Sequence, residues 1–252
     1  MTTKISRPSI RRQTLDRWSL TRLLDNPNHW VLEEIKSDSK KKELIRERNQ
    51  FYMRKRIKTP TSAQSDPFDY SARFFILREN DSDKVLKSLR IVTRDNPLGL
   101  IPLELNLMDA DELQHFSRAY NYPLTQSTLK PEELNHIQQL LSRNVNSGIY
   151  DIGGFFGEGN TASALALILG VTKLCYDESF SFLTQTQNPR HTRCYLDTGL
   201  PYEVIGGDSF EGYEDVCQRP ATTLGIENTR AFRTFYRTSF KRIADEKLTT
   251  NT

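Results

Sequence analysis

A short run of glycines beside acidic residues is the part of this chain best suited to chemistry. The run reads Asp151-Ile-Gly-Gly-Phe-Phe-Gly157-Glu-Gly159-Asn-Thr161. Glycines let backbone amides approach a ligand closely, and the first turn of a following helix has unpaired N–H groups and a partial positive charge. The run therefore predicts a seat for a phosphate group. A tight strand-to-helix turn without a ligand is the simpler interpretation of the same glycines.

The residues on either side of the glycines have the patterns of a strand and a helix. Residues 150–156 are apolar and aromatic, which indicates a buried strand, and residues 162–176 are apolar at helical spacing over about four turns. The loop also fits the dinucleotide pattern G-x-G-x-x-[GA], but that fingerprint belongs at the first strand of a repeated β-α-β domain. Here the loop lies deep in the chain and one β-α-β unit follows it. A dinucleotide site therefore ranks low.

The remaining pattern predicts one α/β (α+β) domain. At 252 residues with 37% hydrophobic content, the chain suits one substantial core. We expect a basic, partly mobile segment at residues 1–28, one domain at 29–247 and a tail at 248–252. Strands are predicted at 30–35, 71–79, 85–93, 181–185 and 202–206, and helices at 14–24, 40–56, 130–141, 189–197 and 227–247. Residues 80–83 between two of the strands are a hairpin signal, and residues 59–69 read as a polar loop.

The positive charge is concentrated at the start of the sequence. Residues 1–60 hold 16 Lys or Arg against 7 Asp or Glu, so they carry +9 and the remainder −6 of the total of +3. The densest basic residues are Lys40, Lys41 and Lys42 with Arg54, Lys55 and Arg56. They could form a solvated helix face or a dock for an acidic partner. Aromatic residues do not alternate with them as in a stacking platform, so sequence-reading nucleic-acid modules are not favoured.

The cysteine and histidine positions favour neither metal nor disulfide chemistry. Cys175, Cys194 and Cys217 form no C-x-x-C pair, and the four histidines show no zinc-ligand spacing, so no metal site is predicted. His191 and Cys194 are close in sequence, which alone does not establish a catalytic pair. No apolar run approaches the roughly 20 residues needed to cross a bilayer. We expect a cytoplasmic location without a membrane span.

The order of these elements resembles the GNAT fold, a mixed and mostly antiparallel central sheet flanked by helices with a phosphate-type loop after the central strand. The acyl-CoA loop of GNAT N-acyltransferases reads [QR]-x-x-G-x-[GA]. Gly154-Phe-Phe-Gly157-Glu-Gly159 matches it, except that Gly154 stands where Gln or Arg is usual. Within that superfamily, the chain looks most like acyl-homoserine-lactone synthases and N-acyl amino acid synthases, which take fatty acyl groups from acyl carrier protein.

Short motifs carry this second resemblance. Arg48 and Tyr52 match a helix motif with an Arg and an aromatic four residues later. Gln64-Ser-Asp66-Pro-Phe-Asp69 keeps both aspartates of a Glu-x-Asp-x-x-Asp loop, and Lys87-Ser-Leu-Arg90 partly matches Gly-x-x-Arg. Ile101-Pro-Leu-Glu104 is similar to a Leu-Pro-Leu-Glu segment, and Asp151-Ile-Gly-Gly154-Phe155 stands where the lactone synthases carry Glu-x-x-Arg-Phe. These departures leave open whether S-adenosylmethionine is a substrate.

The resemblance implies transfer of an acyl group from a thioester to an amine. Such a reaction needs a base or water relay for the ammonium proton and donors for the thioester oxyanion. Asp151 is the first candidate for the base and Glu158 the second, and a salt-bridged strand-end carboxylate is the alternative for Asp151. A charged cluster of Arg48, Asp66, Asp69 and Arg90 would order a loop over the amine, with Tyr52 beside it. Asp66 and Asp69 could equally be turn formers.

The resemblance also implies where the acyl donor lies. Phe155, Phe156 and Gly157 would hydrogen-bond the pantetheine amides, and the loop of Gly157, Gly159, Asn160 and Thr161 would face the phosphate. The donor is expected to be the phosphopantetheine of an acidic acyl carrier protein docked on the basic residues, or acyl-CoA, with no permanently bound cofactor. The acceptor would be an amino acid or S-adenosylmethionine.

A protein that keeps this fold without catalysis is the alternative from another class. Gln64, Lys87 and Gly154 each stand where the family has a signature residue. Nucleic-acid binding through residues 40–58 is a third hypothesis, which predicts retention on heparin and steep salt dependence.

Overall fold

One mixed sheet with helices on both faces forms the molecule. The computed structural model describes residues 29–54, 66–122, 129–144, 148–186, 195–196, 200–206 and 222–251. The strands are β1 (Trp30–Ile35), β2 (Arg73–Glu79), β3 (Val85–Val92), β4 (Ile149–Phe156), β5 (Ser181–Thr186), β6 (Glu203–Gly206), β7 (Thr222–Ile226) and β8 (Leu248–Asn251). The helical elements are α2 (Asp38–Arg54), η1 (Pro67–Tyr70), η2 (Pro102–Leu107), α3 (Ala110–Tyr120), α4 (Pro131–Arg143), α5 (Thr161–Glu178), α7 (Arg230–Phe235), η3 (Tyr236–Phe240) and α8 (Lys241–Lys247).

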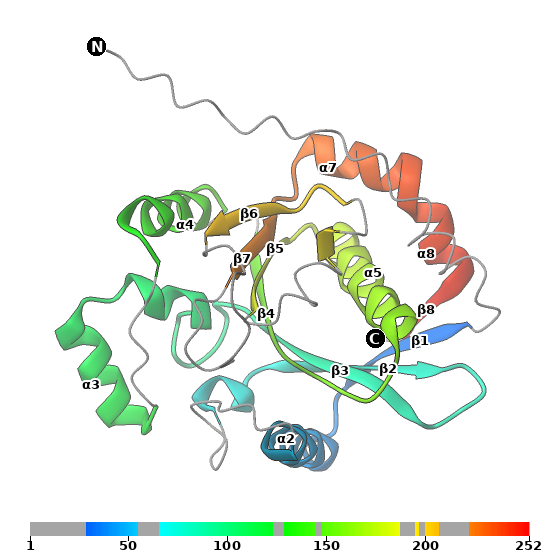
Figure 1. The fold of residues 1–252 in the computed structure, drawn as a ribbon, viewed down its shortest axis with the longest axis horizontal. Helices are drawn as coiled ribbons and strands as arrows, with labels where there is room; N and C mark the ends of the chain where they lie inside the picture. Colours follow the sequence, from blue (N-terminus) through cyan, green and yellow to red (C-terminus); the bar gives the residue numbers. More distant parts are fainter. Residues whose placement is uncertain are drawn as a thin grey trace.

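The strand order within the described residues is β6-β7-β5-β4-β3-β2-β1-β8. The pairs β4–β5 and β1–β8 are parallel, and the other pairs are antiparallel. The predicted mixed, mostly antiparallel sheet flanked by helices is therefore confirmed. Figure 1 shows the sheet curving around α5, with α7 and α8 on the same side and α2, α3 and α4 on the other.

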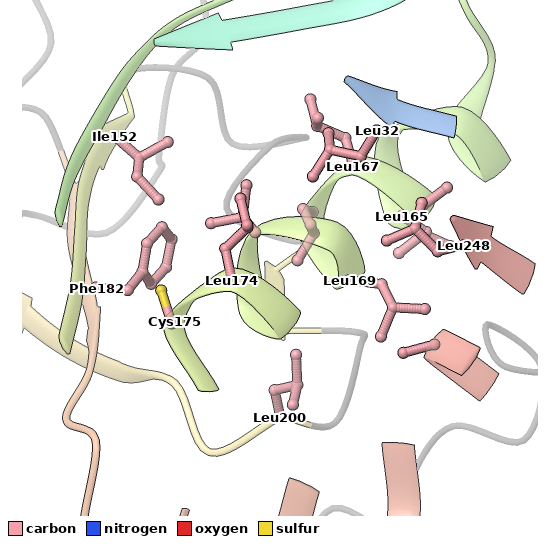
Figure 2. Close-up of a cluster of buried hydrophobic side chains, with 14 of the residues drawn as sticks. Leu32, Ile152, Leu165, Leu167, Leu169, Leu174, Cys175, Phe182, Leu200 and Leu248 are labelled. Atoms are coloured by element: carbon pink, nitrogen blue, oxygen red, sulfur yellow. The ribbon is translucent and has the colours of Figure 1, made fainter. Parts of the chain in front are cut away.

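Each face of the sheet packs its own hydrophobic core. α5 is apolar on nearly all sides, and its leucines pack with Leu32, Ile152, Phe182 and Leu248 from four strands, as Figure 2 shows. This core holds the C-terminal helices on the same face. The opposite face packs against α2, η1, η2, α3 and α4 through a second set of buried side chains, among them Phe68, Phe74 and Ile137. Side chains alternate between the two faces along the regular parts of each strand, so Val92 of β3 and Ile149 of β4 point to the second core.

Most predicted elements before residue 206 are present within the described residues, with ends moved by one to three residues. The β2–β3 hairpin, the central strand β4 and the long helix α5 are confirmed. The predicted helix at 40–56 begins at Asp38, and the end of the polar loop at 59–69 is the short helix η1. The predicted helix at 14–24 and most of the one at 189–197 lie outside the described residues.

Two strands near the C-terminus correct the sequence prediction. β7 was not predicted, because its sequence Thr-Thr-Leu-Gly-Ile is short and lacks a clean apolar alternation. Residues 248–251 were expected to be part of a tail, and they instead form β8 in parallel pairing with β1 from Trp30↔Leu248 to Glu33↔Asn251. The first and last described strands of the chain are therefore neighbours in the sheet.

Candidate active site

The central strand β4 separates from β5 partway along its length. Their parallel pairing runs from Ile149↔Ser181 to Ile152↔Thr184 and then stops. β4 continues to Phe156, whereas β5 continues beside β7 up to the pair Thr186↔Thr222. Beyond Ile152, the backbone of β4 on this side is therefore not used by the β4–β5 ladder. Ladder groups without a strand partner are available to an extended ligand.

A bulge at Gly154 marks the point of separation. Arg90 pairs with Gly153 and Ser88 pairs with Phe156. Residues 88–90 of β3 therefore lie opposite residues 153–156 of β4, which has one extra residue. An extra residue of this kind bends the strand that carries it. Gly154 has φ +62, and an added Cβ would lie 3.3 Å from Nη1 of Arg48 and from Cγ of Arg90. Gly154 therefore gives room to two arginine side chains, which is a physical reason for glycine where the family loop has Gln or Arg.

The turn after β4 is fixed against the start of β3. Gly157 has φ +135, and a Cβ there would lie 2.3 Å from the carbonyl oxygen of Leu86. The same oxygen accepts a hydrogen bond from the amide of Gly159 at 3.1 Å. The Lys87 ammonium donates to the carbonyl of Gly157 at 3.0 Å. The amide of Gly159, which was expected to face a phosphate, is thus already used inside the protein.

The first turn of α5 keeps donors for an anion. The side chain of Asn160 caps the helix by accepting from the amide of Ser163 at 3.0 Å, and the carbonyl of Asn160 accepts from Ala164 at 3.2 Å. The amides of Thr161 and Ala162 donate to no group among the residues that the structure describes. They lie at the positive end of an 18-residue helix, where a negatively charged ligand is stabilised.

Asp151 is buried on β4 two residues before Gly153. It is 7% exposed, and its Oδ2 accepts a hydrogen bond from the amide of Leu103 at 2.7 Å. Burial raises the pKa of Asp151 to about 7, although the Leu103 hydrogen bond and the charge of Arg90 oppose the shift. A carboxyl group with that pKa both gains and loses a proton near neutral pH, as a general base requires.

The predicted charged cluster forms on the same face of the sheet. Asp69 accepts two hydrogen bonds from Arg48, at 2.9 and 2.6 Å, and another from Nη1 of Arg90. Nη2 of Arg90 donates to Asp66 at 2.6 Å. Burial would raise the pKa of Asp69, but the two guanidinium groups outweigh it and hold that pKa below its ordinary value. Two arginines and two aspartates therefore neutralise one another in a buried site.

Asp66 is both a turn former and a member of the charged cluster. Asp66 caps η1 by accepting from the amide of Phe68 at 3.0 Å, and Pro67 occupies the first position of that helix, so Asp66 does form a turn. Its other oxygen pairs with Arg90. The Asp66 side chain thus both caps its own short helix and binds Arg90 on a distant strand.

Tyr52 and the two phenylalanines take different positions. The Tyr52 hydroxyl donates to the carbonyl of Phe155 at 3.1 Å, which ties α2 to the bulged part of β4. The ring of Phe155 lies 5.6 Å from the Lys87 ammonium and packs towards the α5 core. Phe156 belongs to the opposite core, with its ring 6.2 Å from that of Phe51. The two phenylalanine side chains therefore point to opposite faces of the sheet, and only their backbones lie together on β4.

Glu158 is not brought to the buried site. Its side chain is 69% exposed in the loop and lies 3.7 Å from Arg54 at the end of α2. A surface pair of that kind contributes little stability. It does place the C-terminal end of α2 beside the glycine turn. Lys40, Lys41 and Lys42 lie at the other end of this helix, roughly 20 Å away at 1.5 Å per residue, and Lys55 and Arg56 lie outside the described residues.

Sequence reasoning missed what Gly153 and Gly154 do together. Consecutive glycines inside a predicted strand are a signal for a bulge or a close backbone approach, and that signal could have located the bend. The contacts of Lys87 with Gly157 and of Leu103 with Asp151 join segments 70 and 48 residues apart, and no local pattern announces them.

A groove of about 740 Å³ lies between η2 and α3. Its lining includes Leu107, Met108, Asp111, His115 and Tyr120. Glu104 also borders it and pairs with Arg94, at 2.5 Å. None of the charged cluster residues or the glycine turn lines this groove, so it is separate from the site on β4.

Neither a metal centre nor a membrane helix is found in the described part of the chain. No group of three His, Cys, Asp or Glu there could hold a metal ion. No helix there is long and apolar enough to cross a bilayer. Cys175 is a buried free thiol in the α5 core, and Cys194, Cys217 and His191 lie outside the described residues.

Comparison with known proteins finds similarity only among solved structures. No family model matches the chain, and no curated protein matches it. The acyl-homoserine-lactone synthase LasI is 14% identical, with 80% of this chain and 91% of that one covered at a TM-score of 0.48. FeeM, an N-acyl amino acid synthase from uncultured soil microbes, is 14% identical, with 86% and 98% covered at a TM-score of 0.49. BjaI, a CoA-dependent acyl-homoserine-lactone synthase solved with S-adenosylmethionine and isopentyl-CoA, is 12% identical, with 89% and 93% covered at 0.47. These structures come from the branch that the sequence resembles, and at such identities and TM-scores the likeness leaves the chemistry to be argued from the site.

Proposed function

We propose that this protein is an N-acyltransferase. It moves a fatty acyl group from the phosphopantetheine thioester of an acyl carrier protein, or from acyl-CoA, to a small amine. An amino acid would give an N-acyl amino acid, and S-adenosylmethionine would give an acyl-homoserine-lactone-type signal. The cytoplasm, where acyl carrier proteins work, is the expected location.

The order of features along β4 and α5 carries the proposal. Asp151, the separation from β5 after Ile152, the glycine turn and the open amides of Thr161 and Ala162 follow one another along a single direction. The groups of a phosphopantetheine arm, from its phosphate to its thioester, would meet these features in the opposite order, from α5 back to Asp151. Its phosphate would lie at the start of α5, its amides near residues 155–157, beyond the last pair of β4 with β5, and its thioester towards Asp151.

The reaction then proceeds by ordinary acyl transfer. Asp151 takes a proton from the ammonium group, and the amine nitrogen attacks the thioester carbon to form a C–N bond. The carbonyl oxygen becomes an oxyanion, and the C–S bond breaks as the intermediate collapses. The thiolate leaves and takes the second proton of the nitrogen, giving an amide and a free thiol.

The C-terminal end of α2 is the proposed dock for an acidic carrier protein. Arg54 is exposed there and lies beside Glu158 of the glycine turn. A carrier protein held at Arg54 would present its single phosphodiester to that turn, and opposite charges would speed their encounter.

The first test is the product made in cells. The protein is expressed in a bacterium that supplies its own acyl carrier proteins, and the medium is examined by mass spectrometry for acylated amines. We expect a new N-acyl amino acid or N-acyl lactone that is absent from an Asp151→Asn control. A folded, soluble protein that makes no acylated amine would contradict the proposal and favour a non-catalytic binding protein with this fold.

Reversing the charge of Arg54 tests whether the acyl donor is a carrier protein or acyl-CoA. The Arg54→Glu variant should lower kcat/KM for acyl carrier protein about tenfold at low salt, because the attraction to an acidic partner is lost beside the turn. Turnover of acyl-CoA with the same chain should change little. Lys40→Glu is the matched control, since it makes the same charge change at the far end of the same helix. Equal turnover of the two donors by the wild type would remove the preference for a carrier protein.

A further inference from the structure

Arg90 has a buried N–H donor, at Nε, that the charged cluster does not use. Its Nη1 and Nη2 donate to Asp69 and Asp66, which fixes the guanidinium group in place. The side chain is buried, and its Nε–H donates to no group in the described part of the chain. A buried, charged donor without an acceptor costs a few kcal/mol, so such a group is expected to meet an acceptor in the working protein.

The unused donor faces an open position on β4. Arg90 pairs with Gly153 across the β3–β4 ladder, so both point to the same face. A Cβ built on Gly153 would lie 3.8 Å from Nε of Arg90, and no other atom of the described residues, its chain neighbours aside, would come within 4 Å. A small acceptor atom can therefore reach Nε from the direction of Gly153.

The thioester of the proposed donor would end at this position. With its phosphate at the start of α5 and its amides near residues 155–157, the arm runs back along β4 towards Gly153. Gly153 is also the first residue of β4 after its last pair with β5, at Ile152. Asp151 lies on the same face as Gly153, about 7 Å away along the strand. The acceptor amine would have to lie in this interval, between the carboxylate and the thioester carbon.

We propose that Nε–H of Arg90 donates a hydrogen bond to the thioester carbonyl oxygen and stabilises the oxyanion when the amine attacks. This inference rests on the proposed acyltransferase function and adds a catalytic residue to it. Asp66 and Asp69 hold the donor before the reaction starts, so no reorganisation is needed when the negative charge develops. The donor carries positive charge and is shielded from water, which strengthens its bond to the oxyanion.

Two variants remove this hydrogen bond in different ways. Arg90→Lys keeps a positive charge near Asp66 and Asp69 but lacks Nε. Gly153→Ala leaves the cluster untouched and places a methyl group between Nε and the thioester. Its Cβ would sit at an ordinary contact distance from Arg90, so the protein should fold normally. Ser88→Ala is the control, because it deletes a buried hydroxyl that has no hydrogen-bond partner among the described residues and lies on the same face of β3 as Arg90.

The measurements separate catalysis from binding. Octanoyl carrier protein labelled with ¹³C at the carbonyl is bound to each variant, and the carbonyl chemical shift is recorded without any amine. The wild type and Ser88→Ala should move the signal downfield, as a polarised carbonyl does, and the other two variants should not. With the amine that the wild type acylates, Gly153→Ala should lower kcat on the order of 100-fold with the KM of the amine unchanged.

Other results would overturn the inference. A raised KM for the amine with kcat unchanged would mean that Arg90 binds the acceptor instead. An unmoved carbonyl signal in a wild type that binds the carrier protein and turns it over would exclude the hydrogen bond. Wild-type protein that neither binds nor turns over acyl thioesters would refute the proposed function itself, which is a distinguishable outcome.

Discussion

Replacing Asp151 with Asn should remove most acyl transfer and at the same time stabilise the protein. The amide oxygen of Asn can still accept from the amide of Leu103, so the local structure is kept. It cannot take a proton from the ammonium group, and loss of a general base lowers kcat about 10²- to 10⁴-fold. In the wild type, kcat/KM should rise with pH through an apparent pKa near 7, because Asp151 must be ionised to act.

The stability change follows from the raised pKa of Asp151. Its pKa is about 7 in the folded protein against an ordinary value of 3.8. Between these two values the unfolded chain gives up the proton more readily, so wild-type stability falls as pH rises from about 4 to 7. The Asn variant lacks this loss and should be more stable at pH 8 by up to about 4 kcal/mol, whereas at pH 4 the two proteins should be similar.

Urea unfolding at pH 4, 6 and 8, together with a pH profile of turnover, checks these expectations. Asp83→Asn, an exposed aspartate between β2 and β3, is the control for the substitution itself. If Glu158→Gln removed more activity than Asp151→Asn, the base would be in the exposed loop and the assignment of Asp151 would be wrong.

Replacing Asp69 with Asn should cause the largest loss of stability of any change at this site. Asp69 has a fully buried side chain and holds both Arg48 and Arg90. Without its charge, Arg48 loses the carboxylate that it contacts in the described part of the chain, and Arg90 keeps Asp66. Removing one partner of a buried ion pair costs about 3–5 kcal/mol, which is a large part of the stability of a typical domain.

Asp66→Asn provides the matched comparison. Among the described residues Asp66 forms an ion pair with Arg90 alone, whereas Asp69 pairs with two arginines, so the loss of Asp66 should cost less. The depressed pKa of Asp69 adds a pH dependence, because its stabilisation is complete above the ordinary carboxyl pKa and is lost as pH falls through the folded value. The urea midpoints of both variants and the wild type, measured at pH 7 and pH 3.5, would show the stability losses and their pH dependence. Equal, small losses for both variants would mean that the cluster contributes little.

The sequence allowed the fold to be predicted where patterns are local. The β2–β3 hairpin has a turn signal between two apolar runs, and α5 is long and strongly apolar, so each can be read without knowing its neighbours. β7 and β8 have no such pattern, because their places in the sheet depend on pairing with β5, β6 and β1. Tertiary context decides such strands.

The candidate site was predictable in its residues and less so in its geometry. Arg48, Asp66, Asp69 and Arg90 do meet, as the resemblance to the synthase motifs implied. The raised pKa of Asp151 could not be read from sequence, since it arises from burial beneath η2. The use of the Gly159 amide by Leu86 was also hidden, because it needs the start of β3 to lie against the turn.

The pairing of β8 with β1 has a consequence for how the protein is made. Trp30 leaves the ribosome well before Leu248–Asn251, the strand that covers this edge of the sheet. Until then the hydrogen-bonding edge of β1 is open to strands of other chains. Chains interrupted before residue 248 would keep that edge, so premature release during synthesis should yield aggregates rather than a smaller folded protein.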